Sequence, residues 1–98
     1  MLDKMKALMD MQRKMQELKR ELDNALFEIE DSQGLVKVVM NGSQEIKEVQ
    51  LLKEINTLER VQLEKAVKEA YNKAIKRSQE AAAGKMKEIT GFNIPGLG

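Results

Sequence analysis

The chain has 98 residues, 34% of them charged, yet its 17 basic and 16 acidic side chains leave a formal net charge of only +1. This length allows one small domain, and the near-neutral balance excludes a polyanion-binding role that rests on overall charge alone. Cysteine and histidine are both absent, which excludes disulfides, thiolate metal sites and the commonest general base.

The first segment, residues 2–25, has the pattern of a long amphipathic helix. Apolar residues recur every seven positions in two rows, which are Met1, Leu8, Met15, Leu22 and Met11, Leu18, Ala25. This spacing is typical of a helix that lies along another helix. We predict that part of these rows forms a dimer interface, and the alternative is a helix docked on the protein's own sheet. The predicted interface residues are Leu8, Met11, Met15, Leu18 and Leu22.

The sequence then changes to alternating polarity, which predicts three strands near residues 26–31, 35–41 and 45–51. The second of these is the most apolar, so we place it in the middle of an antiparallel meander. Between the first two strands, the turn-forming residues from Asp31 to Gly34 end in a glycine that can supply a left-handed position. The fold class predicted is therefore α+β.

The second strand ends in Asn41-Gly42. Both residue types tolerate positive φ, so this pair predicts a two-residue type I′ hairpin turn. In the third strand, Ile46 and Val49 break strict alternation, which predicts a β-bulge or an early bend.

The pattern of the last long segment predicts a second helix over residues 58–89. Mainly small residues form one stripe along it, which would let the sheet or another helix approach closely, namely Leu63, Val67, Ala70, Ala74, Ser78 and Ala81. Asn56 or Thr57 can cap its N-terminus. Gly84 predicts an end or a kink, because glycine costs about 1 kcal/mol relative to alanine inside a helix. Residues 90–98 form a tail, so the whole chain, 1–98, reads as a single domain.

No catalytic constellation is visible in the sequence. Most carboxylates lie beside lysine or arginine at helical spacing, as on a solvated salt-bridged face. Neither glycine-rich phosphate-binding motif is present, and no apolar run suits a signal peptide or a membrane span. We therefore expect a cytoplasmic protein that is not an enzyme, with no cofactor, no metal, no small-molecule substrate and no membrane partner.

The basic residues are more informative. Lys6, Arg13 and Arg20 recur every two turns on the side of the first helix opposite its apolar rows, with Lys14 beside them. Such a line can follow a phosphate backbone. An adjacent acidic row weakens its field, and this row consists of Asp3, Asp10 and Glu17.

The second helix carries another basic cluster, interleaved with acidic residues, which consists of Lys65, Lys68, Lys73, Lys76 and Arg77. From it we select Lys73, Lys76 and Arg77 as candidates for DNA binding, together with the four basic residues of the first helix. The alternative is that both clusters only keep the surface soluble. The basic faces lack aromatic residues, which disfavours single strands, and no base-reading residue is apparent. The hypothesis is backbone and shape recognition of double-stranded DNA.

The order of elements and the central segment Gly34–Gly42, Gly-Leu-Val-Lys-Val-Val-Met-Asn-Gly, resemble the YbaB/EbfC family of bacterial nucleoid-associated proteins. The resemblance extends over nearly the whole chain and includes Met9–Gln16, Leu63–Ala74 and Phe92–Leu97. It implies a tweezer-like homodimer in the nucleoid that binds DNA with little sequence preference, in an architectural or regulatory role.

A rival hypothesis is a protein-interaction module, similar to a prefoldin subunit, that holds apolar clients with its methionine-rich first helix. The row of Met1, Leu8, Met15 and Leu22 discriminates between the two. Burial of this row in a symmetric dimer favours DNA binding, whereas an exposed row that binds a hydrophobic dye favours client binding.

Overall fold

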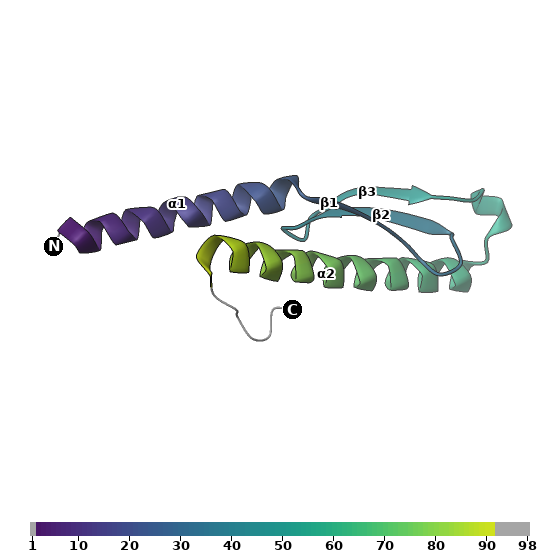
Figure 1. Cartoon of the computed structure of the whole chain (residues 1–98). Coiled ribbons are helices and arrows are strands. Elements are labelled where there is room, and N and C mark those ends of the chain that lie inside the picture. The colour runs from purple at the N-terminus through teal and green to yellow at the C-terminus, as the bar shows by residue number, and fades with distance from the viewer. Residues whose placement is uncertain (1, 92–98) are drawn as a thin grey trace.

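The structure, a computed structural model, describes residues 2–91. The three strands form one antiparallel sheet in the order β1-β2-β3, with α2 along one face and α1 projecting from one end (Figure 1). The fold is α+β, as the sequence predicted. The elements are α1 (Leu2–Asn24), β1 (Leu26–Glu30), β2 (Val36–Asn41), β3 (Ile46–Leu51), the 3-10 helix η1 (Ile55–Thr57) and α2 (Arg60–Thr90).

The molecule is elongated, with extents of 66 × 23 × 15 Å. α2 runs along one face of the sheet and continues beside the second half of α1 (Figure 1). The first half of α1 extends past the end of α2, so it lies beside no other described element (Figure 1).

The core lies between β2 and α2. The three side chains of β2 on this face are fully or almost fully buried, and they are Val36, Val38 and Met40. They meet a stripe of alanines at four-residue spacing on α2, which consists of Ala66, Ala70 and Ala74. Because alanine has a short side chain, α2 can lie close to the strand.

The turn between β1 and β2 has the predicted left-handed glycine, since Gly34 has a φ of 70°. The buried carboxylate of Asp31 accepts backbone N–H bonds from Gln33, Leu35 and Val36 at 3.0, 2.8 and 2.8 Å. Burial opposes the ionised form, but the donors together outweigh it and lower the pKa of Asp31.

The turn between β2 and β3 differs from the prediction. A type I′ turn is wrong, because positive φ is found at Gln44 (64°) and at neither Asn41 nor Gly42. The side-chain oxygen of Asn41 accepts N–H bonds from Ser43 and Glu45 at 3.0 and 2.9 Å, which holds a longer loop.

Gly42 serves packing instead of turn geometry. Its N–H donates to the carbonyl oxygens of Leu22 at 2.8 Å and Ala25 at 3.1 Å. A Cβ at position 42 would lie 2.9 Å from Leu22 Cδ2 and 3.0 Å from Leu22 O. The loop therefore docks on the end of α1, where only glycine fits without a shift.

Two details of the strands and α2 complete the comparison with the sequence. The predicted bulge is confirmed, because the pairing register shifts between Val39 and Met40. The predicted end at Gly84 is wrong, since α2 continues to Thr90. Contacts between α1 and α2 outweigh the small cost of one helical glycine.

The predicted N-cap of α2 is also wrong. Asn56 and Thr57 belong to η1, and the N-cap residue is Glu59, which makes no side-chain capping bond. Thr57 instead donates its hydroxyl to the carbonyl oxygen of Glu54 at 2.6 Å. A separate 3-10 turn has taken the capping residues away from the helix.

Candidate nucleic-acid interface

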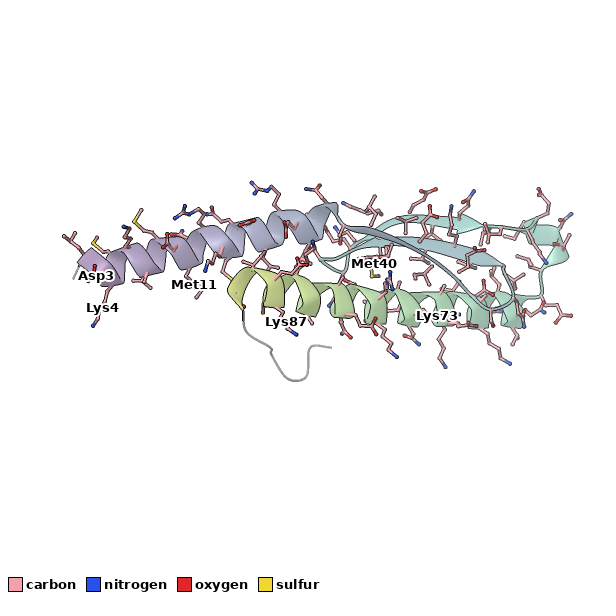
Figure 2. The ribbon with its side chains drawn as sticks, in the orientation of Figure 1. Asp3, Lys4, Met11, Met40, Lys73 and Lys87 are labelled. Atoms are coloured by element: carbon pink, nitrogen blue, oxygen red, sulfur yellow. The ribbon has the colours of Figure 1, made fainter. Side chains whose placement is uncertain are left out.

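α1 presents a basic row on the side that faces away from the rest of the chain. Leu18 is 6% exposed where α1 packs against α2, and Lys4 points toward the side on which α2 lies (Figure 2). Arg20 lies about 200° round the helix from Leu18. With Lys6 and Arg13 at seven-residue spacing, it forms an exposed line, which we name the outer α1 row.

The outer α1 row is only partly neutralised by its acidic neighbours. Arg13 forms an ion pair with Asp10. Within residues 2–91, no ion pair involves Lys6, Arg20 or the neighbouring Lys14. The row therefore offers at least two cations to an anionic ligand.

The structure divides the predicted cluster on α2. Lys73 lies 2.7 Å from the Glu69 carboxylate and 3.4 Å from the carbonyl oxygen of Glu30. The Arg77 guanidinium lies 5.5 Å from the centroid of the Phe27 ring, at cation–π distance. Both basic side chains are thus engaged on the flank of α2 that faces β1.

This flank is a small polar network. Glu69 also accepts bonds from the N–H and the hydroxyl of Ser32, both at 2.9 Å. The hydrogen bond from Lys73 and those from Ser32 lower the pKa of Glu69, against the effect of partial burial. The network ties α2 to the turn after β1, so Lys73 has a structural role in the folded chain.

Lys76, the remaining candidate on α2, faces outward. Lys68 and Lys76 follow Ala66 and Ala74 by two positions, about 200° round the helix from the face that covers the sheet. Lys65 is exposed but lies toward the β1 flank, because it precedes Ala66 as Lys73 precedes Ala74 and it lines a hollow with Asp31 and Gln33. We name Lys65, Lys68 and Lys76 the outer α2 row, and none of them forms an ion pair within the described part of the chain. The sequence pattern placed these three lysines in one cluster with Lys73 and Arg77. It could not show that Lys73 and Arg77 are engaged on the flank of α2 that faces β1.

Charge is separated along the chain despite the small net value. Residues 2–20 carry six basic and three acidic side chains, and residues 60–77 carry six and two. Residues 21–59, which include the sheet, carry three basic and nine acidic side chains. Residues 2–20 of α1 and residues 60–77 of α2 are therefore positive, whereas residues 21–59, which begin with the acidic last turn of α1 and include the sheet, are negative. This favours anion binding along the two positive stretches.

The five predicted dimer-interface residues fall into two groups. Leu18 is buried and Leu22 is half-buried within the chain itself, close to Gly42. Leu8, Met11 and Met15 are exposed, on the part of α1 that extends toward and past the end of α2. These three remain available to a second chain.

A second apolar surface was not predicted. α2 packs on β1 and β2, and Val49 and Leu51 pair with Val38 and Val36, so they lie on the same face of the sheet. Nevertheless Val49 is 57% and Leu51 is 43% exposed. The helix covers two strands and leaves the third open.

The flank of α2 beside this open strand is also apolar. Lys73 precedes Ala74 and faces β1, whereas Val67 and Tyr71 follow Ala66 and Ala70 and so lie on the other flank. We name this surface the uncovered apolar face, and it consists of Ile46, Val49, Leu51, Val67 and Tyr71, all exposed. The apolar residues of the third strand are visible in the sequence. Which strand α2 leaves uncovered, however, depends on how α2 docks on the sheet, and the sequence pattern does not show this.

Other kinds of site find no support in the described residues. Among them no group of three or more acidic side chains is placed to hold a metal ion. No described helix is long and apolar enough to cross a membrane. The surface features that stand out in residues 2–91 are therefore the two basic rows and the uncovered apolar face.

Comparison with known proteins gives a consistent result. Residues 1–92 match the model of the YbaB/EbfC DNA-binding family. A nucleoid-associated protein of Clostridium acetobutylicum is 33% identical over 88% of this chain and 79% of its own length. Nucleoid-associated proteins of Clostridium kluyveri and Pelotomaculum thermopropionicum are 34% and 37% identical, each over 95% of this chain and 83% and 90% of their own lengths.

Proposed function

The chain belongs to the YbaB/EbfC DNA-binding family, and on that premise we propose that it binds double-stranded DNA through the phosphate backbone, with little sequence preference. Its place of action is the nucleoid, in an architectural or regulatory role. The names of the family and of its relatives indicate DNA-binding proteins and not enzymes.

The observation that carries this proposal is the separation of charge. Both helices expose rows of cations of which only Arg13 is ion-paired within the described residues, while the acidic side chains concentrate between residues 21 and 59. Each row has three cations, and the outer α1 row spans about 21 Å and the outer α2 row about 16 Å at 1.5 Å per residue. Neither row contains an aromatic side chain that could stack on bases. Rows of this kind suit duplex phosphates better than base edges.

The first test is the salt dependence of duplex binding, measured by fluorescence anisotropy with a mixed-sequence duplex and a scrambled competitor. Neutralising three phosphates predicts a slope of about −2.7 for log affinity against log salt, which is about a 40-fold loss between 50 and 200 mM. A scrambled duplex should compete equally well. Salt-independent binding, or a strong preference for one sequence, would contradict backbone recognition.

The second test removes both rows by changing six residues to glutamine, namely Lys6, Arg13, Arg20, Lys65, Lys68 and Lys76. A matched control makes the same change in charge by replacing Lys19, Lys37, Lys47, Lys53, Lys85 and Lys87. We expect the first variant to lose at least 30-fold in affinity and the control to lose less than 5-fold. Equal losses would show that only overall charge matters and would remove the rows from the proposal.

We also propose that the protein is a homodimer. A single chain leaves two apolar surfaces open, one at Leu8, Met11 and Met15 and the other at the uncovered apolar face. Contiguous exposed apolar residues typically mark interaction surfaces. A second copy would present each basic row twice, which strengthens binding by weak rows.

Sedimentation velocity tests the dimer and identifies its surface. Val49→Glu places a charge in the uncovered apolar face, and Met11→Glu does the same on α1. We expect the wild type to sediment as a dimer and at least one variant as a monomer. A monomeric wild type at micromolar concentration would refute the proposal.

Client holding is a second candidate, because α1 exposes Leu8 and Met15 on one side. If this stripe binds apolar clients, the wild type should bind a hydrophobic dye and suppress aggregation of an unfolded protein. Leu8→Gln together with Met15→Gln should then abolish both effects without weakening DNA binding. No dye binding by the wild type would exclude this function.

A further inference from the structure

The two basic rows face opposite sides of the molecule. The sheet and α1 lie on one side of α2 (Figure 1). Lys68 and Lys76 of the outer α2 row point away from the sheet, while Lys65 lies at the edge of the row toward β1. The outer α1 row points away from the side of α1 that packs against α2. The rows are also displaced along the molecule, because Lys65–Lys76 lies in the half of α2 beside the sheet and Lys6–Arg20 lies toward the other end (Figure 1).

One straight duplex cannot reach both rows at once. An α-helix with side chains is about 10–12 Å across, so the outer sides of two stacked layers are about 20 Å apart. To touch both, one duplex would have to bend round the chain. Even a bend of 40–90° over 20–30 base pairs costs about 1–6 kcal/mol, and a turn round a body this thin would be sharper.

We propose that the protein bridges two DNA duplexes, with the outer α1 row on one duplex and the outer α2 row on the other. This inference rests on the proposed function, because it assumes that both rows bind phosphates. It assigns the rows to separate duplexes, which duplex binding alone does not require. Each protein molecule then links two DNA segments about 20 Å apart on either side of its stacked layers.

Assembly into a dimer does not obstruct this arrangement. The uncovered apolar face lies on the flank of α2 that carries Val67 and Tyr71, which follow the sheet-facing alanines by about 100°. Lys68 and Lys76 lie a further 100° or so round the helix. A second copy seated on that flank would leave the outer α2 row open, and the outer α1 row lies on a different helix.

The test uses one duplex fixed on beads and a second, labelled duplex in solution, and it measures how much labelled duplex the full-length protein recovers. Three variants are compared with the wild type, and single-duplex binding of each is followed by anisotropy. One variant carries Lys65→Gln, Lys68→Gln and Lys76→Gln, the second carries Lys6→Gln, Arg13→Gln and Arg20→Gln, and the matched control carries Lys37→Gln, Lys47→Gln and Lys53→Gln. Circular dichroism verifies that each remains folded.

We expect the wild type and the control to recover the labelled duplex. Each row variant should keep single-duplex affinity within about threefold of the wild type through its remaining row, yet recover at least tenfold less labelled duplex. The inference is overturned if the wild type binds but does not bridge, or if either row variant bridges as well as the wild type. It is also overturned if one row variant loses all binding while the other loses none. Absence of any anisotropy change with the wild type would instead refute duplex binding itself.

Discussion

The sheet end and the free end of α1 use similar residues in opposite ways. Around β2, apolar side chains such as Val36 and Met40 are fully buried by the chain itself. Along the first half of α1, Leu2, Met5 and Leu8 are exposed, because no other described element lies beside them. The first half of α1 is shorter than about 12–15 residues, and an isolated helix that short is only marginally stable in water. The sheet end therefore holds the fold, and the free end depends on its continuity with the packed half of α1 or on a partner.

Truncating one methionine at each end gives the sharpest test of this difference. Met40 is 0% and Met9 is 66% exposed. Met40→Ala should cost about 3 kcal/mol of unfolding free energy, because it opens a cavity between β2 and α2. Met9→Ala should change it by less than about 0.5 kcal/mol. Urea denaturation at one fixed protein concentration measures both, and similar losses would mean that the free end is packed in solution.

Acid should weaken the sheet end through Asp31. Since its pKa in the folded chain is lowered, its contribution is complete above the unfolded pKa of about 3.9 and is lost as the pH falls through the folded value. Asp31→Asn removes the charge and one acceptor for the turn, so it should cost about 2 kcal/mol at pH 6. The gap between wild type and variant, measured by urea denaturation from about pH 6 to about pH 2, should shrink. A gap independent of pH would show that the charge is irrelevant.

The joint between the two ends lies at Gly42. Gly42→Ala would press a methyl group against Leu22 at the end of α1, so we expect a loss of about 1–2 kcal/mol. Hydrogen exchange should show faster opening of the last turns of α1 than of β2. Unchanged stability would mean that the loop can move away from α1 at little cost.

Much of this fold could be predicted because its signals are local. Alternation and period predicted the helices and the sheet, and the break between Ile46 and Val49 predicted the bulge. The role of Gly42 was predicted wrongly, because glycine is required there by the close approach of Leu22, which lies far away in the sequence. A two-residue pattern cannot report such a contact, and it therefore gave the wrong turn type.

The candidate interface was predictable to a similar depth. The seven-residue spacing of the outer α1 row reads directly as one face of a helix. On α2, residues as close as Lys73 and Lys76 have different surroundings, since the first bonds to Glu69 and the second faces outward. That difference depends on which face of α2 meets the sheet. The same docking leaves Val49 open, so the uncovered apolar face had to come from the structure.

The smallest expected effect has the opposite sign and uses the part of α2 that packs beside α1. Gly84 lies inside α2, and its φ is not in the left-handed region. A Cβ at this position would meet nothing within 4 Å. Gly84→Ala should therefore stabilise the protein by about 1 kcal/mol, because alanine restricts the unfolded chain and favours the helix. The urea midpoint should rise with an unchanged slope. A loss of stability would show that α2 bends at Gly84 in solution and that its packing against α1 is looser than the contacts indicate. Because Gly42→Ala makes the same chemical change with the opposite expected sign, the pair separates a glycine kept for close approach from one that the fold does not need.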